Sequence, residues 1–239
     1  MTPRIDTIVI DCPDPEVLAA FYAELLDMQI LRRPPDLMTI GREDEHPRLA
    51  FQAIEEYHPP QWPDPAYPKQ VHLDIGVPDA TATRAWLGDH GATWHEDGTD
   101  CQVWSDPAGH PFCVAHDTWS APTIGGIVLD SEDHSALAAF YAELLGLHQT
   151  RHEWDSFWRM LDSGDGPILS FAKIDEHRQP RWPDPTYPPQ IHLDIAVEDP
   201  TAVETAKHLG AIQLPDIGGP WPVYADPVGH PLCLCSPSQ

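Results

Sequence analysis

The sequence repeats itself at a spacing of about half its length. Four blocks recur in the same order: AAFYAELL at 19–26 and 138–145, WPDP at 62–65 and 182–185, HLDI at 72–75 and 192–195, and DPAGHP at 106–111, which returns as DPVGHP at 226–231. All four keep an offset of 119 or 120 residues, so the chain is a tandem duplication. The repeat predicts two domains, residues 1–118 and 119–239, divided near the polar, proline-containing stretch 118–122.

The length of the chain fits this division, and its charge disfavours two classes of partner. The 239 residues suit one large or two small domains, at about 100–200 residues each. The formal charge of −25 disfavours contact with phosphate backbones and anionic lipids. We therefore expect neither nucleic-acid nor membrane binding.

The cellular location is predicted from the length of the apolar runs, the composition of the N-terminus and the cysteine content. No apolar run approaches the roughly 18 residues that span a bilayer, and the N-terminus lacks a basic region followed by a long apolar one. The five cysteines are odd in number and form no CxxC pair. These features predict a cytoplasmic protein with reduced thiols and no disulfide framework.

Each half has the same expected order of elements. In the first half, residues 5–10 read as a β-branched strand, and Asp14, Pro15 and Glu16 open a helix that reaches about Leu26. Two or three strands follow, ending in 48–54, and then a proline-rich connection over 58–65. A second round comprises the strand 71–77, the helix 80–90 and further strands near 94–95, 102–105 and 111–115. The order strand–helix–strands therefore occurs twice in each half.

These motifs resemble the vicinal-oxygen-chelate superfamily, and more closely its glyoxalase-like domain proteins. The resemblance rests on the Phe21–Leu26 helix motif, on the segment 72–79 (HLDIGVPD) and on the Asp-Pro-x-Gly turn at 106–109, all repeated in the second half. The superfamily includes glyoxalase I, extradiol dioxygenases and bleomycin-resistance proteins. The resemblance implies an α+β fold of tandem glyoxalase-like domains. Each domain would consist of two paired βαβββ modules whose mixed sheet forms a ligand-binding cup.

The resemblance also implies where a metal would bind. Members that use a metal take ligands from the first, fourth, fifth and eighth strands. The matching positions here are Thr7 and Gly126, then Gln52 and Ala172 as the nearest candidates, then His72 and His192, and finally Cys113 and Cys233. A catalytic metal needs about three protein ligands. We therefore expect a degenerate site and no cofactor; the alternative is a divalent metal held by His72 or His192 with the cysteine and an aspartate.

Strand alternation pairs each of these histidines with an aspartate. His72 and Asp74 share one face of their strand, and His192 and Asp194 repeat the pattern. The other face is apolar and must pack under the helices, so the polar pair points into the cup. One interpretation is an acid–base pair in which the aspartate fixes the histidine tautomer. The other is a structural network, in which the histidine hydrogen-bonds an aspartate that is paired elsewhere.

Aromatic and cysteine residues complete the expected ligand-binding set. The candidates for the cup lining are Trp62, Trp104, Trp154, Trp158, Trp182, Cys113 and Cys233. Pockets for small molecules are largely apolar, which favours this role. The alternative is that the tryptophans are core or interdomain anchors and the cysteines small buried hydrophobes.

Three functions follow from these patterns. The favoured one is binding of a small apolar or aromatic metabolite, by a monomer or homodimer. The second is an enzyme, a lyase or isomerase that uses His72 and Asp74 or His192 and Asp194, with or without a divalent metal; a dioxygenase is less favoured. The third is a pseudo-enzyme with filled cups, against which the small residues Gly76, Cys113 and Ala115 argue.

Overall fold

The computed structural model describes residues 2–62, 64, 68–98, 101–115, 119–150, 158–162, 164, 166–182, 190–216 and 221–236, with only the backbone of 149, 150 and 159. The first half contains β1 (Arg4–Cys12), α1 (Pro15–Leu25), β2 (Gln29–Arg32), β3 (Leu37–Gly41), β4 (Arg48–Ala53), β5 (Val71–Gly76), α2 (Ala80–Asp89), β6 (Thr93–Asp97), β7 (Cys101–Ser105) and β8 (Pro111–Ala115). The second half contains β9 (Thr123–Ser131), α3 (His134–Leu145), β10 (His148–Thr150), β11 (Trp158–Asp162), β12 (Ile168–Lys173), β13 (Ile191–Ala196), α4 (Thr201–His208), β14 (Ile212–Gln213), β15 (Val223–Ala225) and β16 (Pro231–Cys235).

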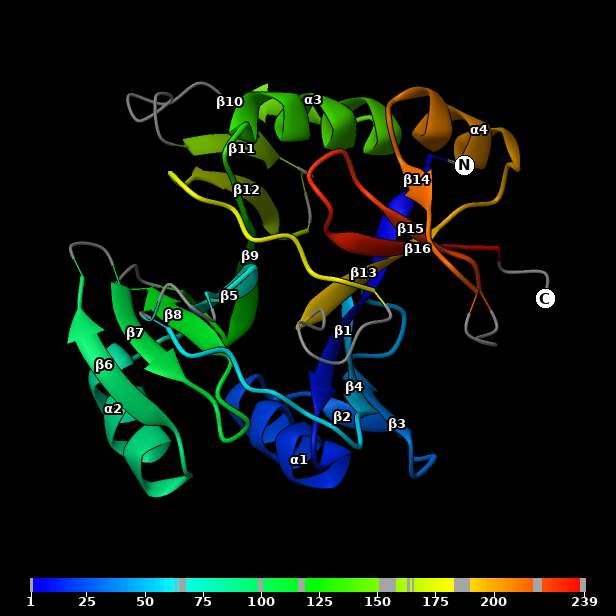
Figure 1. Cartoon of the computed structure of the whole chain (residues 1–239). Coiled ribbons are helices and arrows are strands. Elements are labelled where there is room, and N and C mark those ends of the chain that lie inside the picture. Colours follow the sequence, from blue (N-terminus) through cyan, green and yellow to red (C-terminus); the bar gives the residue numbers. More distant parts are fainter. Residues whose placement is uncertain are drawn as a thin grey trace.

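These elements form four βαβββ modules, which confirms the predicted α+β class. Module 1 contains β1–β4 with α1, module 2 β5–β8 with α2, module 3 β9–β12 with α3, and module 4 β13–β16 with α4. Two sheets result (Figure 1). Sheet A has the strand order β14-β15-β16-β13-β1-β4-β3-β2, and sheet B has the order β10-β11-β12-β9-β5-β8-β7-β6.

Each sheet therefore combines one module from each half of the sequence. Sheet A joins modules 1 and 4 through the antiparallel pair β1–β13, and sheet B joins modules 2 and 3 through the antiparallel pair β5–β9. Within each module the first and last strands pair in parallel, as in β1–β4 and β13–β16. The repeat boundary marks the duplication of the sequence, whereas the cups are shared between the halves. We call the concave faces of the two sheets cup A and cup B.

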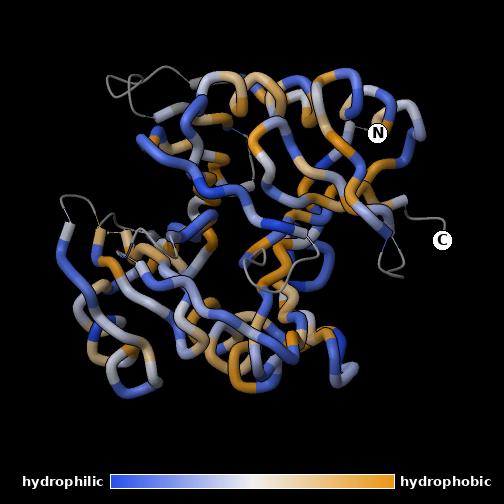
Figure 2. The backbone as a smooth tube through the Cα atoms, in the orientation of Figure 1, coloured by the Kyte–Doolittle hydropathy of each residue, from blue (hydrophilic) through white to orange (hydrophobic). Residues whose placement is uncertain are grey.

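The helices cover the opposite face of each sheet. On β1, Ile8 and Ile10 are fully buried in the apolar cluster that also contains Leu18 and Tyr22 of α1. The hydropathy colouring in Figure 2 follows this pattern, with hydrophobic stretches along the strands and helices and hydrophilic ones in the connections. Alternation along each strand then leaves the intervening side chains for the cups.

The first helix begins where the sequence predicts. The Asp14 carboxylate accepts hydrogen bonds from the backbone N–H groups of Glu16 and Val17, at 3.0 and 3.2 Å, and Pro15 occupies the first turn. This side-chain cap satisfies N–H groups that have no partner within the helix.

A buried Tyr–Asp–His network links the two modules of each half. The Tyr22 hydroxyl on α1 donates to Asp106, which follows β7, and Asp106 also contacts His110 Nδ1 at 3.1 Å. The same contacts join Tyr141, Asp226 and His230 in the second half, at 3.2 and 3.1 Å. Because α1 packs on sheet A while the β7–β8 turn belongs to sheet B, the network holds the sheets together.

A reciprocal hydrogen bond marks the approximate two-fold relation between the halves. The backbone N–H of Gln70 donates to Gln190 Oε1 at 3.1 Å, and the backbone N–H of Gln190 donates to Gln70 Oε1 at 3.3 Å. Both side chains are buried. Among the helices that the structure describes, none is both long and apolar enough to cross a membrane.

Sharing of the cups predicts the behaviour of an isolated half. Residues 1–118 alone would leave the free edges of β1 and β5 without their antiparallel partners. A second copy offers equivalent strands, so we expect a dimer in which the copies exchange modules. Light scattering after size-exclusion chromatography should give twice the mass of the half-chain. A folded monomer of residues 1–118 would contradict the expectation, and mixing with residues 119–239 should produce a one-to-one complex.

One buried aspartate differs between the halves in its partner. Asp130 of β9 forms an ion pair with Lys69, at 2.7 Å from Oδ1 to Nζ. Its counterpart Asp11 of β1 is also buried, and its Oδ1 has no hydrogen-bond partner among the described residues. Burial raises the pKa of Asp11 to about 7, although the nearby His110 acts in the opposite direction.

This pKa predicts a pH-dependent contribution to stability. The folded state retains the Asp11 proton between about pH 4 and pH 7, whereas the unfolded chain releases it. The contribution of this residue to the free energy of unfolding therefore falls as pH rises through that window. Asp11→Asn should be roughly 2–4 kcal/mol more stable than the wild type at pH 8 and similar to it near pH 4. Urea titrations at several pH values measure this difference, and the exposed Asp89→Asn is the control; a constant difference between wild type and Asp11→Asn would refute it.

Candidate functional site

Strand β13 places two polar side chains in cup A. His192 and Asp194 are two residues apart and share the concave face, while the leucine and isoleucine that follow each of them lie in the core. In the strand register, Asp194 lies between Thr7 of β1 and Cys233 of β16. The floor of cup A thus brings together the candidate site residues His192, Asp194 and Cys233, with Thr7 beside them.

Cup B repeats the arrangement with residues of β5, β8 and β9. Asp74 lies between Cys113 and Gly126, and His72 occupies the same face two residues earlier. The candidate site residues His72, Asp74 and Cys113 are therefore neighbours in cup B, as are His192, Asp194 and Cys233 in cup A.

The ligand atoms of each triad converge. One nitrogen of the histidine, one carboxylate oxygen and the cysteine sulfur all lie within 4.8 Å of one another in both cups. The Nε2–Oδ1 separation is 3.6 Å between His72 and Asp74 and 3.7 Å between His192 and Asp194. These separations exceed hydrogen-bond length, so the tautomer-fixing bond envisaged from the sequence is not formed. Both Nδ1 atoms are buried and have no partner among the described residues.

Burial determines the protonation of the triads. It lowers the pKa of His192 and raises the pKa of Asp194, and each partner's charge only partly offsets the effect. In cup B, burial lowers the pKa of His72 well below its usual value, assisted by Lys69, and raises the pKa of Asp74 to about 6. Both imidazoles are thus neutral near pH 7, which leaves a nitrogen lone pair free to accept a proton or bind a metal.

The cysteines are poor nucleophiles in this setting. Burial and the Asp194 charge raise the pKa of Cys233. The pKa of Cys113 is raised chiefly by a hydrogen bond with the Cys101 thiol and then by burial. Since the thiolate is the reactive form, these thiols are unsuited to covalent catalysis without a cation beside them.

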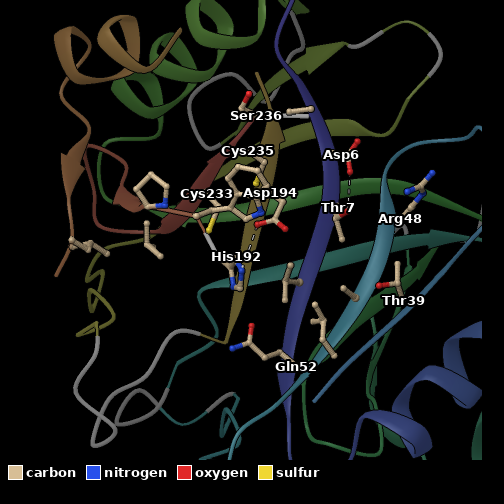
Figure 3. A pocket seen from close by; sticks show the side chains of 18 of the residues that line it. Asp6, Thr7, Thr39, Arg48, Gln52, His192, Asp194, Cys233, Cys235 and Ser236 are labelled. Atoms are coloured by element: carbon tan, nitrogen blue, oxygen red, sulfur yellow. Dashed lines mark hydrogen bonds and ion pairs between the residues drawn. The ribbon is translucent and has the colours of Figure 1, made fainter. Parts of the chain in front are cut away.

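Cup A encloses a cavity of about 710 Å³ above the triad (Figure 3). Its volume lies within the range of small-molecule sites. Trp182 and Trp221 are among the residues that line it, and Val9 and Ala50, in register with His192, form part of the floor. The cavity therefore offers aromatic and apolar surface beside the polar triad.

Most of the charged residues of this cavity are divided by module. Module 1 contributes Arg4, Arg32 and Arg48, together with Asp6, which pairs with Arg4 at 3.2 Å. Module 4 contributes carboxylates only, from Asp194, Glu198 and Asp216. We call the side with Arg32 and Arg48 the basic wall and the side with the module 4 carboxylates the acidic wall, and a ligand in cup A lies between them.

Cup B has the same triad, but different residues lie around it. A Cβ atom at Gly76 would collide with the Trp119 ring, and one at Gly125 would lie 3.1 Å from it, so this tryptophan covers part of the sheet. Trp158 and Met160 of β11 share the concave face by register with β12. This wall is apolar, in contrast to the basic wall of cup A.

The predicted tryptophans have different fates. Trp182 lines the cavity of cup A and Trp158 lies on the cup face of sheet B. Trp62 packs against His95 with ring centroids 5.3 Å apart, at the β6 edge of sheet B. Assignment of Trp104 to the cup lining was wrong, because it is 3% exposed in the core on the helix side, beside Phe112. Trp154 lies outside the described residues.

The arginine wall and Trp221 were missed by the sequence analysis. Arg48 pairs in register with Thr7 and therefore occupies the same row of cup A as Asp194. The signal was present in the repeat, because the residue 120 positions after Arg48 is Ile168. A charged residue in one copy and an apolar one in the other indicates divergence of the two cups.

Comparisons with known proteins agree with this architecture. The crystal structure of glyoxalase I from Zea mays matches with a TM-score of 0.67 and 17% identity, covering 98% of this chain and 92% of that one. A putative dioxygenase from Bacillus subtilis matches with a TM-score of 0.65 and 14% identity, covering 100% and 86%. The cppA protein from Streptococcus pneumoniae matches with a TM-score of 0.51 and 10% identity, covering 98% of both chains. At these identities the likeness shows the fold alone.

No curated protein sequence matches the chain. The family model described as "Glyoxalase-like domain" matches twice, at residues 7–115 and 126–235. The two matches follow the two halves of the repeat and together span most of the sequence. The chain belongs to the glyoxalase-like domain family, of which it carries two tandem copies.

Proposed function

We propose that the chain binds a small organic molecule in cup A, above His192, Asp194 and Cys233. The observation that carries this proposal is the cavity of about 710 Å³, whose floor holds a converging polar triad. Trp182 and Trp221 supply surface for an apolar or aromatic part of the ligand. Binding of this kind needs no chemistry at the triad.

The donor set of the triad suits a divalent metal. An imidazole, a carboxylate and a thiolate are ligand types that hold Zn²⁺, and three protein ligands leave a position open for a ligand oxygen. Asp194 supplies the third donor that the first strand, with Thr7, does not. In this arrangement the neutral imidazole of His192 needs no deprotonation before it binds. A bound metal would polarise an oxygen of the organic molecule.

A lyase or isomerase is the second candidate function. It is favoured by the neutral His192 and by Asp194, whose raised pKa lets it hold a proton closer to neutral pH. Such a pair can accept a proton at His192 Nε2 and return one from the carboxyl group. His192 Nδ1 has no hydrogen-bond partner among the described residues, so the ring orientation relies on packing.

Filling the cavity tests the binding proposal. Ala50 is buried on the floor of cup A, so Ala50→Phe should occupy the space that a ligand needs. Quenching of tryptophan fluorescence by a panel of aromatic metabolites should be seen with the wild type and lost in Ala50→Phe. The matched control is Ser170→Phe, at the equivalent position of cup B, which should keep the cup A signal. Binding that survives Ala50→Phe would refute the location.

Metal retention is a separate measurement. After incubation with Zn²⁺, Fe²⁺, Mn²⁺ or Ni²⁺ and desalting, elemental mass spectrometry should find one of these metals near stoichiometric amounts. His192→Ala should abolish retention of the metal bound in cup A, which is at most about one metal per chain. His208→Ala, at the exposed end of α4, should have no effect. Absence of retention would leave metal-free binding as the function of cup A.

A further inference from the structure

Arginines are concentrated in one cavity of a strongly acidic chain. The sequence has ten arginines and a net charge of −25, and three of the ten line cup A. Arg4 is paired with Asp6 at 3.2 Å. Arg32 and Arg48, in contrast, have no ion-pair partner among the residues that the structure describes. Arg32 and Arg48 thus lack an ion-pair partner among the described residues, although the chain is rich in carboxylates.

Arg48 is the more constrained of the two. It is half-buried at the start of β4, and its Nε atom is buried without a hydrogen-bond partner in the described part of the chain. An unsatisfied buried donor costs free energy unless an acceptor arrives with a ligand. Guanidinium groups bind carboxylates and phosphates through parallel N–H donors, and these charge-assisted bonds are among the strong ones.

The strand register gives the distance between this cation and the triad. Arg48, Thr7 and Asp194 lie in one row across β4, β1 and β13 (Figure 3). Neighbouring strands are about 4.8 Å apart, so the backbones at Arg48 and Asp194 are separated by roughly 10 Å. One ring bearing an acidic group fits such a span.

We propose that cup A selects ligands that carry an oxyanion, a carboxylate or a phosphate, which Arg48 binds with help from Arg32. The opposite end of the ligand then lies over His192, Asp194 and Cys233. This inference rests on the proposed function and specifies its ligand class. Thr39 and Gln52, which also line the cavity, offer a hydroxyl and an amide beside the basic wall.

Cup B provides an internal contrast. It keeps the triad, but Ile168 occupies the place of Arg48, in register with Gly126. With Met160 and Trp158 on the same wall, no described residue of that wall supplies a cation. Lys69 is close enough to His72 to lower its pKa, but it is already paired with Asp130. The selection for an anion therefore belongs to cup A.

The test compares three probes that share a phenyl ring and differ in the charge of its substituent. Benzoate, phenyl phosphate and benzamide are titrated into the wild type, Arg48→Gln, Arg48→Lys and Arg33→Gln by calorimetry. Arg33 is exposed, adjoins Arg32 and does not line the cavity, so Arg33→Gln is the matched control for charge. We expect at least one anion to bind about tenfold or more tightly than benzamide, with the preference lost in Arg48→Gln, partly kept in Arg48→Lys and unchanged in Arg33→Gln.

The outcomes separate this inference from the proposed function. The tighter of the two anions identifies a carboxylate or a phosphate as the preferred group. Equal affinity for all three probes, or an anion preference that Arg48→Gln leaves intact, would overturn the anion site while small-molecule binding in cup A stands. Failure of all three probes to bind the wild type would count against the proposed function, and with it against the inference. Circular dichroism confirms that each variant is folded.

Discussion

The antiparallel pairing of strands from different halves underlies the whole molecule. β1 pairs with β13 and β5 with β9, so neither cup can form from one half alone. The His–Asp pair of each cup lies on one strand of this central pairing, and the neighbouring positions across it are Thr7 in cup A and Gly126 in cup B. The Tyr–Asp–His networks and the reciprocal Gln70–Gln190 bonds then fix the two sheets against each other. The position of the chemistry therefore depends on backbone pairing over long sequence separations.

Duplication has left two copies of one triad in two different settings. In both cups a histidine, an aspartate and a cysteine converge, and burial keeps the imidazole neutral. The walls have diverged: cup A has Arg48 where cup B has Ile168, and cup B has glycines where Trp119 packs. A chain with two such cups can keep the same floor while each wall recognises a different molecule.

Local sequence signals predicted the helices and strands well, whereas the pairing of strands that are distant in the sequence was not predicted. The Asp14 cap, the β-α-β-β-β order and the shared face of His192 and Asp194 follow from short-range rules of capping and alternation. The exchange of modules between halves could not be predicted, because β1 could pair equally well with β5 or with its repeat β13. Trp104 was misassigned because a tryptophan on a strand can face either the cup or the core. In the structure it lies in the core, in register with Phe112, and its Nε1 donates to Gln102. Arg48 escaped notice because its significance arises only from Thr7 and Asp194 in the neighbouring strands.

The exchange of modules also divides the chain in the order of its synthesis. Sheet B is built from one continuous stretch, from β5 to β12, whereas sheet A joins the two ends of the chain. On a ribosome, β1 must wait for β13, which is translated some 180 residues later, while both parts of sheet B emerge in succession. Pairings of long sequence separation close late because of their loop entropy. Sheet B is thus positioned to fold first and to serve as the template, and module 1 lacks its native partner strand β13 until the last fifth of the chain has been made.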